Sequence, residues 1–147
     1  MRRGDETAEH HGAEALFQEL AHLVHSKLEL GILGSREALR LPGHVQAPHL
    51  PHGVHDFAPS PRLIEFMSKR FPDAGLVRGK INDPFILMIA LIGSCGTIAY
   101  TKQSDFDFWL CYQDGHYDRD IINLYKTKLR AIESWVFDKF NIEVHFY

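Results

Sequence analysis

Apolar positions along the chain change their spacing several times, and each change predicts a different element. From Ala13 onward, leucine and valine residues recur at helical spacing until glycines at positions 31 and 34 end the pattern. We therefore expect an amphipathic N-terminal helix of about 17 residues. Residues 1–12 are polar, have no periodicity and are expected to form a frayed tail.

A short helix and a strand are predicted in the middle of the chain. Ser60 is a good N-cap and Pro61 fits the first helical position, so a helix should begin there. Its apolar face is supplied by Leu63, Ile64, Phe66, Met67 and Phe71. Pro84 then opens an uninterrupted apolar run, Phe85 to Ile92. Because this run has no polar residue, we expect a central strand that is covered on both faces.

The last third of the chain predicts a strand, a long helix and another strand. Phe106 to Tyr112 alternates and indicates the first strand. Asp118 or a neighbour should cap a helix over about Arg119 to Phe140, and Asn141 suits its C-terminal end. Ile142 to Tyr147 then alternates again. This order indicates an α+β fold, with a mixed β-sheet flanked by helices and an N-terminal helical segment.

Residues 41–61 contain five of the seven prolines, with four histidines between them: His44, His49, His52 and His55. Closely spaced imidazoles can bind zinc. Here the prolines prevent a helix from aligning the rings and no cysteine accompanies them, so a solvated loop is favoured over an incidental metal site. We therefore divide the chain into a tail and helix (1–40), a Pro/His-rich linker or loop (41–60) and a core (61–147).

Composition narrows the range of partners. The formal charge of −3 gives no reason to expect a nucleic-acid surface. Cys95 and Cys111 lie in apolar runs, which is typical of reduced cysteines, and the N-terminus lacks the pattern of a signal peptide. The longest apolar run is shorter than the roughly 20 residues of a membrane helix. We therefore expect a cytoplasmic protein without a nucleic-acid or membrane partner.

Candidate chemistry is concentrated in the stretch GSCGTIAYTKQSDFDFWL, Gly93 to Leu110. Alternation puts the carboxylates of Asp105 and Asp107 on one face of a strand, about 6–7 Å apart along the backbone. Two such carboxylates repel each other unless they are solvated at a sheet edge or bound to a cation. Oxygen ligands at this spacing favour Mg²⁺ or Mn²⁺ over zinc. Both the solvated strand and the metal site stay open at this point.

The last strand offers a third carboxylate, Glu143, on the same face as His145 and Tyr147. If this strand lies beside the strand with the two aspartates, the three acids would form a two-metal site, and Glu143 could also accept a proton from a hydroxyl group.

Four residues that precede the predicted strand Phe106 to Tyr112 are candidates for nucleotide and phosphate binding: Gly93, Ser94, Lys102 and Ser104. A Gly-Ser pair is common at ordinary turns, and a solvated role for Lys102 is the more common explanation.

The spacing of these residues resembles a known superfamily. A Gly-Ser turn, an Asp-x-Asp strand eleven residues after the serine and an acid on a later strand resemble the DNA polymerase β-type nucleotidyltransferases. Within that superfamily, GSCGTIAYTKQSDFDFWLCYQ, the helix containing Trp135 and the terminal IEVHFY are similar to the catalytic domain of bacterial class I adenylate cyclases. The resemblance is strongest from Ile92 to Tyr147.

The resemblance implies a nucleotidyltransferase-type sheet and the conversion of ATP to 3′,5′-cyclic AMP and pyrophosphate with two Mg²⁺ or Mn²⁺ ions. It implies that Asp105, Asp107 and Glu143 are catalytic metal ligands and that Gly93 and Ser94 hold the triphosphate. Cyclases of this class have a longer catalytic region, so we expect a core that is truncated at its C-terminal end. Two alternatives are nucleotide transfer to a separate protein or RNA acceptor, and a non-catalytic nucleotide-binding module.

Overall fold

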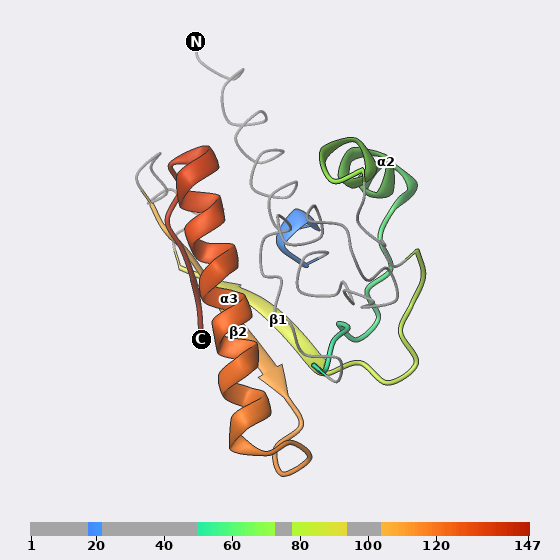
Figure 1. Ribbon diagram of the computed structural model, residues 1–147, viewed down its shortest axis with the longest axis vertical. Coiled ribbons are helices and arrows are strands. Elements are labelled where there is room, and N and C mark those ends of the chain that lie inside the picture. The colour runs from blue at the N-terminus through green and yellow to red at the C-terminus, as the bar shows by residue number, and fades with distance from the viewer. Residues whose placement is uncertain (1–17, 22–49, 73–77, 94–103) are drawn as a thin grey trace.

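The computed structural model describes residues 18–21, 50–72, 78–93 and 104–147 (Figure 1). The described elements are α2 (Pro61–Arg70), β1 (Ile86–Ile92), β2 (Phe106–Tyr112), α3 (Arg119–Phe140) and β3 (Val144–Phe146). They form an α+β arrangement with one mixed three-stranded sheet, as predicted. Residues 18–21 are helical, which agrees with the predicted N-terminal helix. The rest of that helix and the predicted tail lie outside the described residues.

β2 is the central strand of the sheet, whose order is β1-β2-β3. It pairs antiparallel with β1, where Ile92 lies opposite Asp107, and parallel with β3, where Phe106 lies opposite Val144. Parallel neighbours need a crossover connection, and α3 provides it across one face of the sheet (Figure 1). This topology confirms that the last strand lies beside the strand with the aspartates.

β1 lies at the edge of the described sheet, so the prediction of a central strand covered on both faces is wrong. Leu87, Met88 and Ile92 leave 46%, 51% and 44% of their surface exposed. An uninterrupted apolar run shows that a strand avoids polar residues. It does not show which other segment covers each face, because that depends on contacts distant in the sequence.

The helices begin and end where their capping residues predict. Ser60 and Asp118 cap α2 and α3 by accepting a hydrogen bond from the backbone N–H three residues further on, at 3.2 Å and 2.8 Å. At the other end of α3, Asn141 adopts the left-handed conformation (φ 53°) and donates its N–H to the Phe137 carbonyl. This cap ends the helix and turns the chain into β3.

The core lies between α3 and one face of the sheet. Phe106 and Phe108 of β2 are buried on this face, together with Val144 of β3 and with Ile132 and Val136 of α3. Because side chains alternate along a strand, the intervening residues of β2 and β3 belong to the opposite face. That opposite face carries the candidate site.

Two segments before β1 pack against the same core. Val54 is buried and forms an isolated parallel bridge with Ile86, so part of the predicted linker lies along β1. α2 contributes the buried Met67, and its Arg70 guanidinium lies 5.5 Å from the centre of the Trp135 ring on α3. The C-terminal end of α2 therefore contacts α3 through Arg70.

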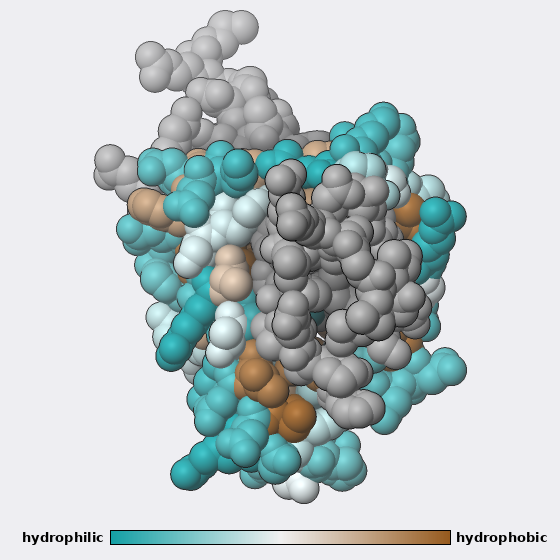
Figure 2. Space-filling view, in the orientation of Figure 1, coloured by the Kyte–Doolittle hydropathy of each residue, from teal (hydrophilic) through white to brown (hydrophobic). Residues whose placement is uncertain are grey.

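The coloured part of the surface in Figure 2 is largely hydrophilic, with an apolar area in the lower half of the view, where Figure 1 shows α3 and the end of β2. Within the described ranges, no helix has both the length and the apolar character needed to cross a membrane.

Candidate metal and nucleotide site

The candidate site lies on the face of the sheet opposite the core. Asp105 directly precedes β2 and Asp107 lies within it, so both alternate with the buried Phe106 and Phe108. In the adjacent β3, His145 lies opposite Asp107. Regular strand geometry therefore brings polar side chains from two distant parts of the chain onto one face.

Asp105, Glu143 and His145 form a compact group on this face. Each offers a potential ligand atom, and these atoms all lie within 4.8 Å of one another. The Phe106 N–H donates to the Glu143 carbonyl at 3.0 Å, which holds the backbone of Glu143 beside Asp105. Both carboxylates are exposed and His145 is half-buried. Two carboxylates and an imidazole at this spacing can hold a divalent metal ion.

Asp107 lies next to this group rather than within it. On its other side is Gly93, which has φ +116°, a conformation that favours glycine. A Cβ atom at Gly93 would lie 4.0 Å from Asp107 Oδ2, so the backbone leaving β1 passes beside this carboxylate. The structure thus brings together the glycine of the predicted turn and one of the two aspartates.

Two predicted phosphate-binding residues, Ser94 and Lys102, lie outside the described residues. Ser104 is half-buried and directly precedes Asp105. Neither His52 nor His55 belongs to a group with metal-ligand spacing among the described residues, whereas His55 Nδ1 lies 3.4 Å from the Asp56 carboxylate.

The electrostatic environment at the end of β3 is negative. The pKa of the Tyr147 hydroxyl is raised, first by the charge of Asp107 and then by loss of solvation, the charge of Asp105, a hydrogen bond with Asp107 and the charge of Glu133. Negative charge disfavours ionisation of the phenol and favours a cation at the same place. The field at this end of the sheet therefore suits a positively charged ligand.

His145 is the member of the compact group to which sequence reasoning gave no role. The signal for it was present, because a residue two positions after Glu143 in a strand points to the same side. What the sequence does not show is which carboxylate stands closest to it across the sheet. That depends on the parallel register between β2 and β3.

Residues 7–147 match the family described as the adenylate cyclase NT domain. The chain belongs to this family. The chain is similar to the adenylate cyclase of Haemophilus influenzae, with 30% identity over 118 residues, covering 74% of the chain and 14% of that protein. It is also similar to the adenylate cyclase of Pasteurella multocida, with 28% identity over 113 residues, covering 73% of the chain and 13% of that protein. No solved structure matches the chain.

Family membership confirms the adenylate cyclase part of the resemblance. The chain spans only 13–14% of the length of the two curated relatives. The nucleotidyltransferase superfamily, the metal ions and the roles of individual residues stay predictions.

Proposed function

We propose that this chain is part of an adenylate cyclase, in which it binds the metal-bound triphosphate of ATP during formation of 3′,5′-cyclic AMP and pyrophosphate. The observation that supports this proposal is the group formed by Asp105, Glu143 and His145 on the open face of a chain of this family. A nucleotidyltransferase-type core, of which this sheet is part, is the architecture we propose for it.

The donor atoms fit a hard divalent cation. Carboxylate oxygens are preferred by Mg²⁺ and Mn²⁺, and the imidazole of His145 makes Mn²⁺ the better match of the two. Asp105 and Glu143 would hold one ion, and Asp107, beside them, would help to hold a second. Ions bound there would supply positive charge for the polyphosphate and lower the pKa of an attacking hydroxyl group.

The protein's own groups have separate tasks in this proposal. Glu143 is exposed and next to Asp105, so it can accept the proton of the ribose 3′-hydroxyl that attacks the α-phosphorus. The P–O bond to pyrophosphate breaks as the new ester bond forms. Gly93, which brings the backbone close to Asp107, is the proposed start of the phosphate-binding turn, with Ser94, Lys102 and Ser104 as further contacts.

Product analysis tests this proposal. When the complete cyclase that contains this chain is supplied with ATP and Mg²⁺ or Mn²⁺, we expect it to form cyclic AMP and pyrophosphate in equal amounts. Both products are measured by liquid chromatography with mass spectrometry. Asp105→Asn and Glu143→Gln should abolish both products, whereas Asp138→Asn, at an exposed acid on α3, should leave them unchanged.

Three results would contradict the proposal in different ways. Unchanged turnover in Asp105→Asn and Glu143→Gln would remove these residues from the site. Pyrophosphate accompanied by a nucleotide-modified acceptor would indicate nucleotidyl transfer. ATP binding by calorimetry without any product would indicate a non-catalytic nucleotide-binding module.

A further inference from the structure

The end of β2 has a free edge on the side of β3. β3 pairs with Phe106 to Phe108, and the Leu110 N–H donates to the Tyr147 carbonyl at 2.8 Å. Even-numbered residues of β2 direct their backbone groups to this side, as these bonds show. The next groups in the series are the Leu110 carbonyl and the Tyr112 N–H. Among the described residues, no strand lies opposite them.

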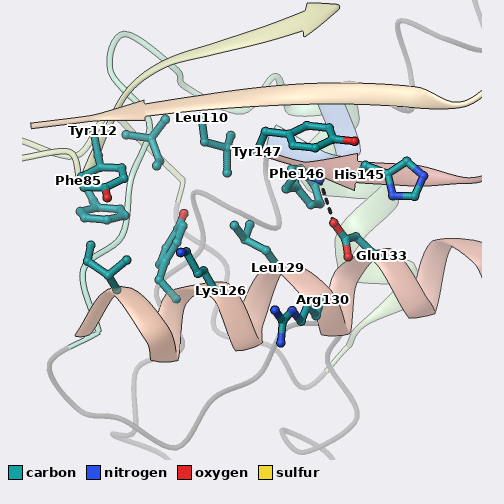
Figure 3. A pocket seen from close by; sticks show the side chains of 13 residues that line it. Phe85, Leu110, Tyr112, Lys126, Leu129, Arg130, Glu133, His145, Phe146 and Tyr147 are labelled. Carbon is teal, nitrogen blue, oxygen red and sulfur yellow. Dashed lines mark hydrogen bonds between the residues drawn. The ribbon is translucent and has the colours of Figure 1, made fainter. Parts of the chain in front are cut away.

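A cavity of about 580 Å³ lies below this free edge, between β2 and the first half of α3 (Figure 3). Leu110 and Tyr112 line it from the sheet, Leu129 lines it from α3, and Phe85, whose ring stacks on that of Tyr112 at 5.2 Å, closes one end. In a strand continuing the register of β3, residues opposite Leu110 and Tyr112 would direct their side chains toward α3. These side chains would enter the cavity.

Three polar residues on one side of α3, Lys126, Arg130 and Glu133, also line the cavity. Glu133 Oε1 accepts a hydrogen bond from the Phe146 N–H at 2.8 Å, so this helix already contacts the outer edge of β3 (Figure 3). Arg130 and Lys126 lie three and seven residues before Glu133, on the same side of the helix, and both line the cavity. Both side chains are hydrogen-bond donors. They lie beside the outer edge of a strand that continues β3, where the carbonyl groups pointing away from β2 could accept from them.

We propose that the free edge of β2 and this cavity form a seat for an extended segment of the longer cyclase polypeptide. The segment pairs parallel to β2 in the register of β3, and its alternate apolar side chains fill the cavity. Strand addition of this kind combines backbone pairing with pockets for every second side chain. His145 and Tyr147 also line the cavity, so this seat and the candidate metal site share part of their surface. The two proposals are tested separately, because the measurements below follow strand pairing at the Tyr112 amide and not metal binding or turnover.

A pair of extended chains tests the proposal. A short segment of alternating valine and threonine is appended to Tyr147 in two versions. In the in-phase chain the valines lie opposite Leu110 and Tyr112, and in the shifted chain the same residues are displaced by one position. A one-residue shift moves every side chain to the other face. In the first chain we expect a higher Tm and hydrogen exchange of the Tyr112 amide slowed by about tenfold or more. The shifted chain should match the original one in both measurements.

Two further measurements sharpen the result. Arg130→Met should reduce the gain in Tm of the in-phase chain while leaving the Tm of the unextended chain nearly unchanged. Equal protection of the Tyr112 amide in both extended chains, or in neither, would overturn the proposal. So would binding of 8-anilinonaphthalene-1-sulfonate that is as strong in the in-phase chain as in the unextended chain, because the cavity would then be a small-molecule site.

Discussion

The two faces of the sheet are made from the same strands, yet they have different tasks. On β2, Phe108 is 1% exposed beneath α3, whereas its neighbour Trp109 is 53% exposed on the other face. The covered face is constrained by packing, which tolerates little change in side-chain volume. On the open face, strand geometry fixes the spacing of Asp105 and Asp107 without using them in the core. A substitution on the covered face should therefore lower the stability of the fold, and a substitution of an acid on the open face should weaken metal binding.

The largest expected effect follows from removing a core ring. Phe108→Ala should lower the free energy of unfolding by about 3–5 kcal/mol, because it removes a buried side chain and leaves a cavity. The matched change on the open face, Trp109→Ala, should cost less than about 1 kcal/mol. Urea denaturation followed by circular dichroism measures both values. Similar losses in the two variants would show that the open face is also packed.

Lys128 is a charged residue on the covered side, and burial lowers its pKa from 10.5 to about 8. Between these pH values the unfolded chain holds a proton that the folded chain has released, so stability should rise with pH across this window. The full rise is of order 3 kcal/mol. Below about pH 8 Lys128 is protonated in both the folded and the unfolded chain, so its contribution to stability no longer changes with pH.

Lys128→Met should flatten this pH dependence. Urea denaturation at pH 7, 8, 9 and 10 on both proteins isolates the contribution of Lys128, since other groups titrate equally in each. An unchanged slope in the variant would mean that the ammonium group stays charged and compensated in the folded chain.

A smaller effect is expected at the turn that leads to the open face. Asn141 holds a left-handed conformation, which costs an alanine about 1–2 kcal/mol more than a glycine. Asn141→Ala should therefore lower the Tm, and Asn141→Gly should leave it nearly unchanged. If both variants melt at the same temperature, the left-handed cap does not limit the placement of β3.

Local signals in the sequence predicted most of the fold. The caps at Ser60, Asp118 and Asn141 and the alternation of the last two strands act over a few residues, and the structure confirms each of them. The position of β1 at the edge of the described sheet depends on what packs against it from distant segments. Periodicity alone therefore could not predict it.

The candidate site was predictable to a similar extent. Alternation placed the two aspartates on one face and Glu143 on the same face as His145. The structure adds the distances between strands, which bring Glu143 and His145 to Asp105 and leave Asp107 beside Gly93. Those distances follow from the parallel register in which β3 pairs with β2. The two strands are separated in the sequence by α3, so their register cannot be read from local patterns.

The smallest effect on stability is expected for the acids of the open face, where exposed substitutions usually change stability by no more than about 0.5 kcal/mol. Their effect on metal binding is the most direct test of the site. Titration calorimetry with Mn²⁺ would compare the unaltered chain with Asp105→Asn, Glu143→Gln and the control Asp138→Asn. We predict that the first two variants lose at least about tenfold in affinity while the control keeps it. Equal Mn²⁺ affinity in all four proteins would contradict a metal site on this face.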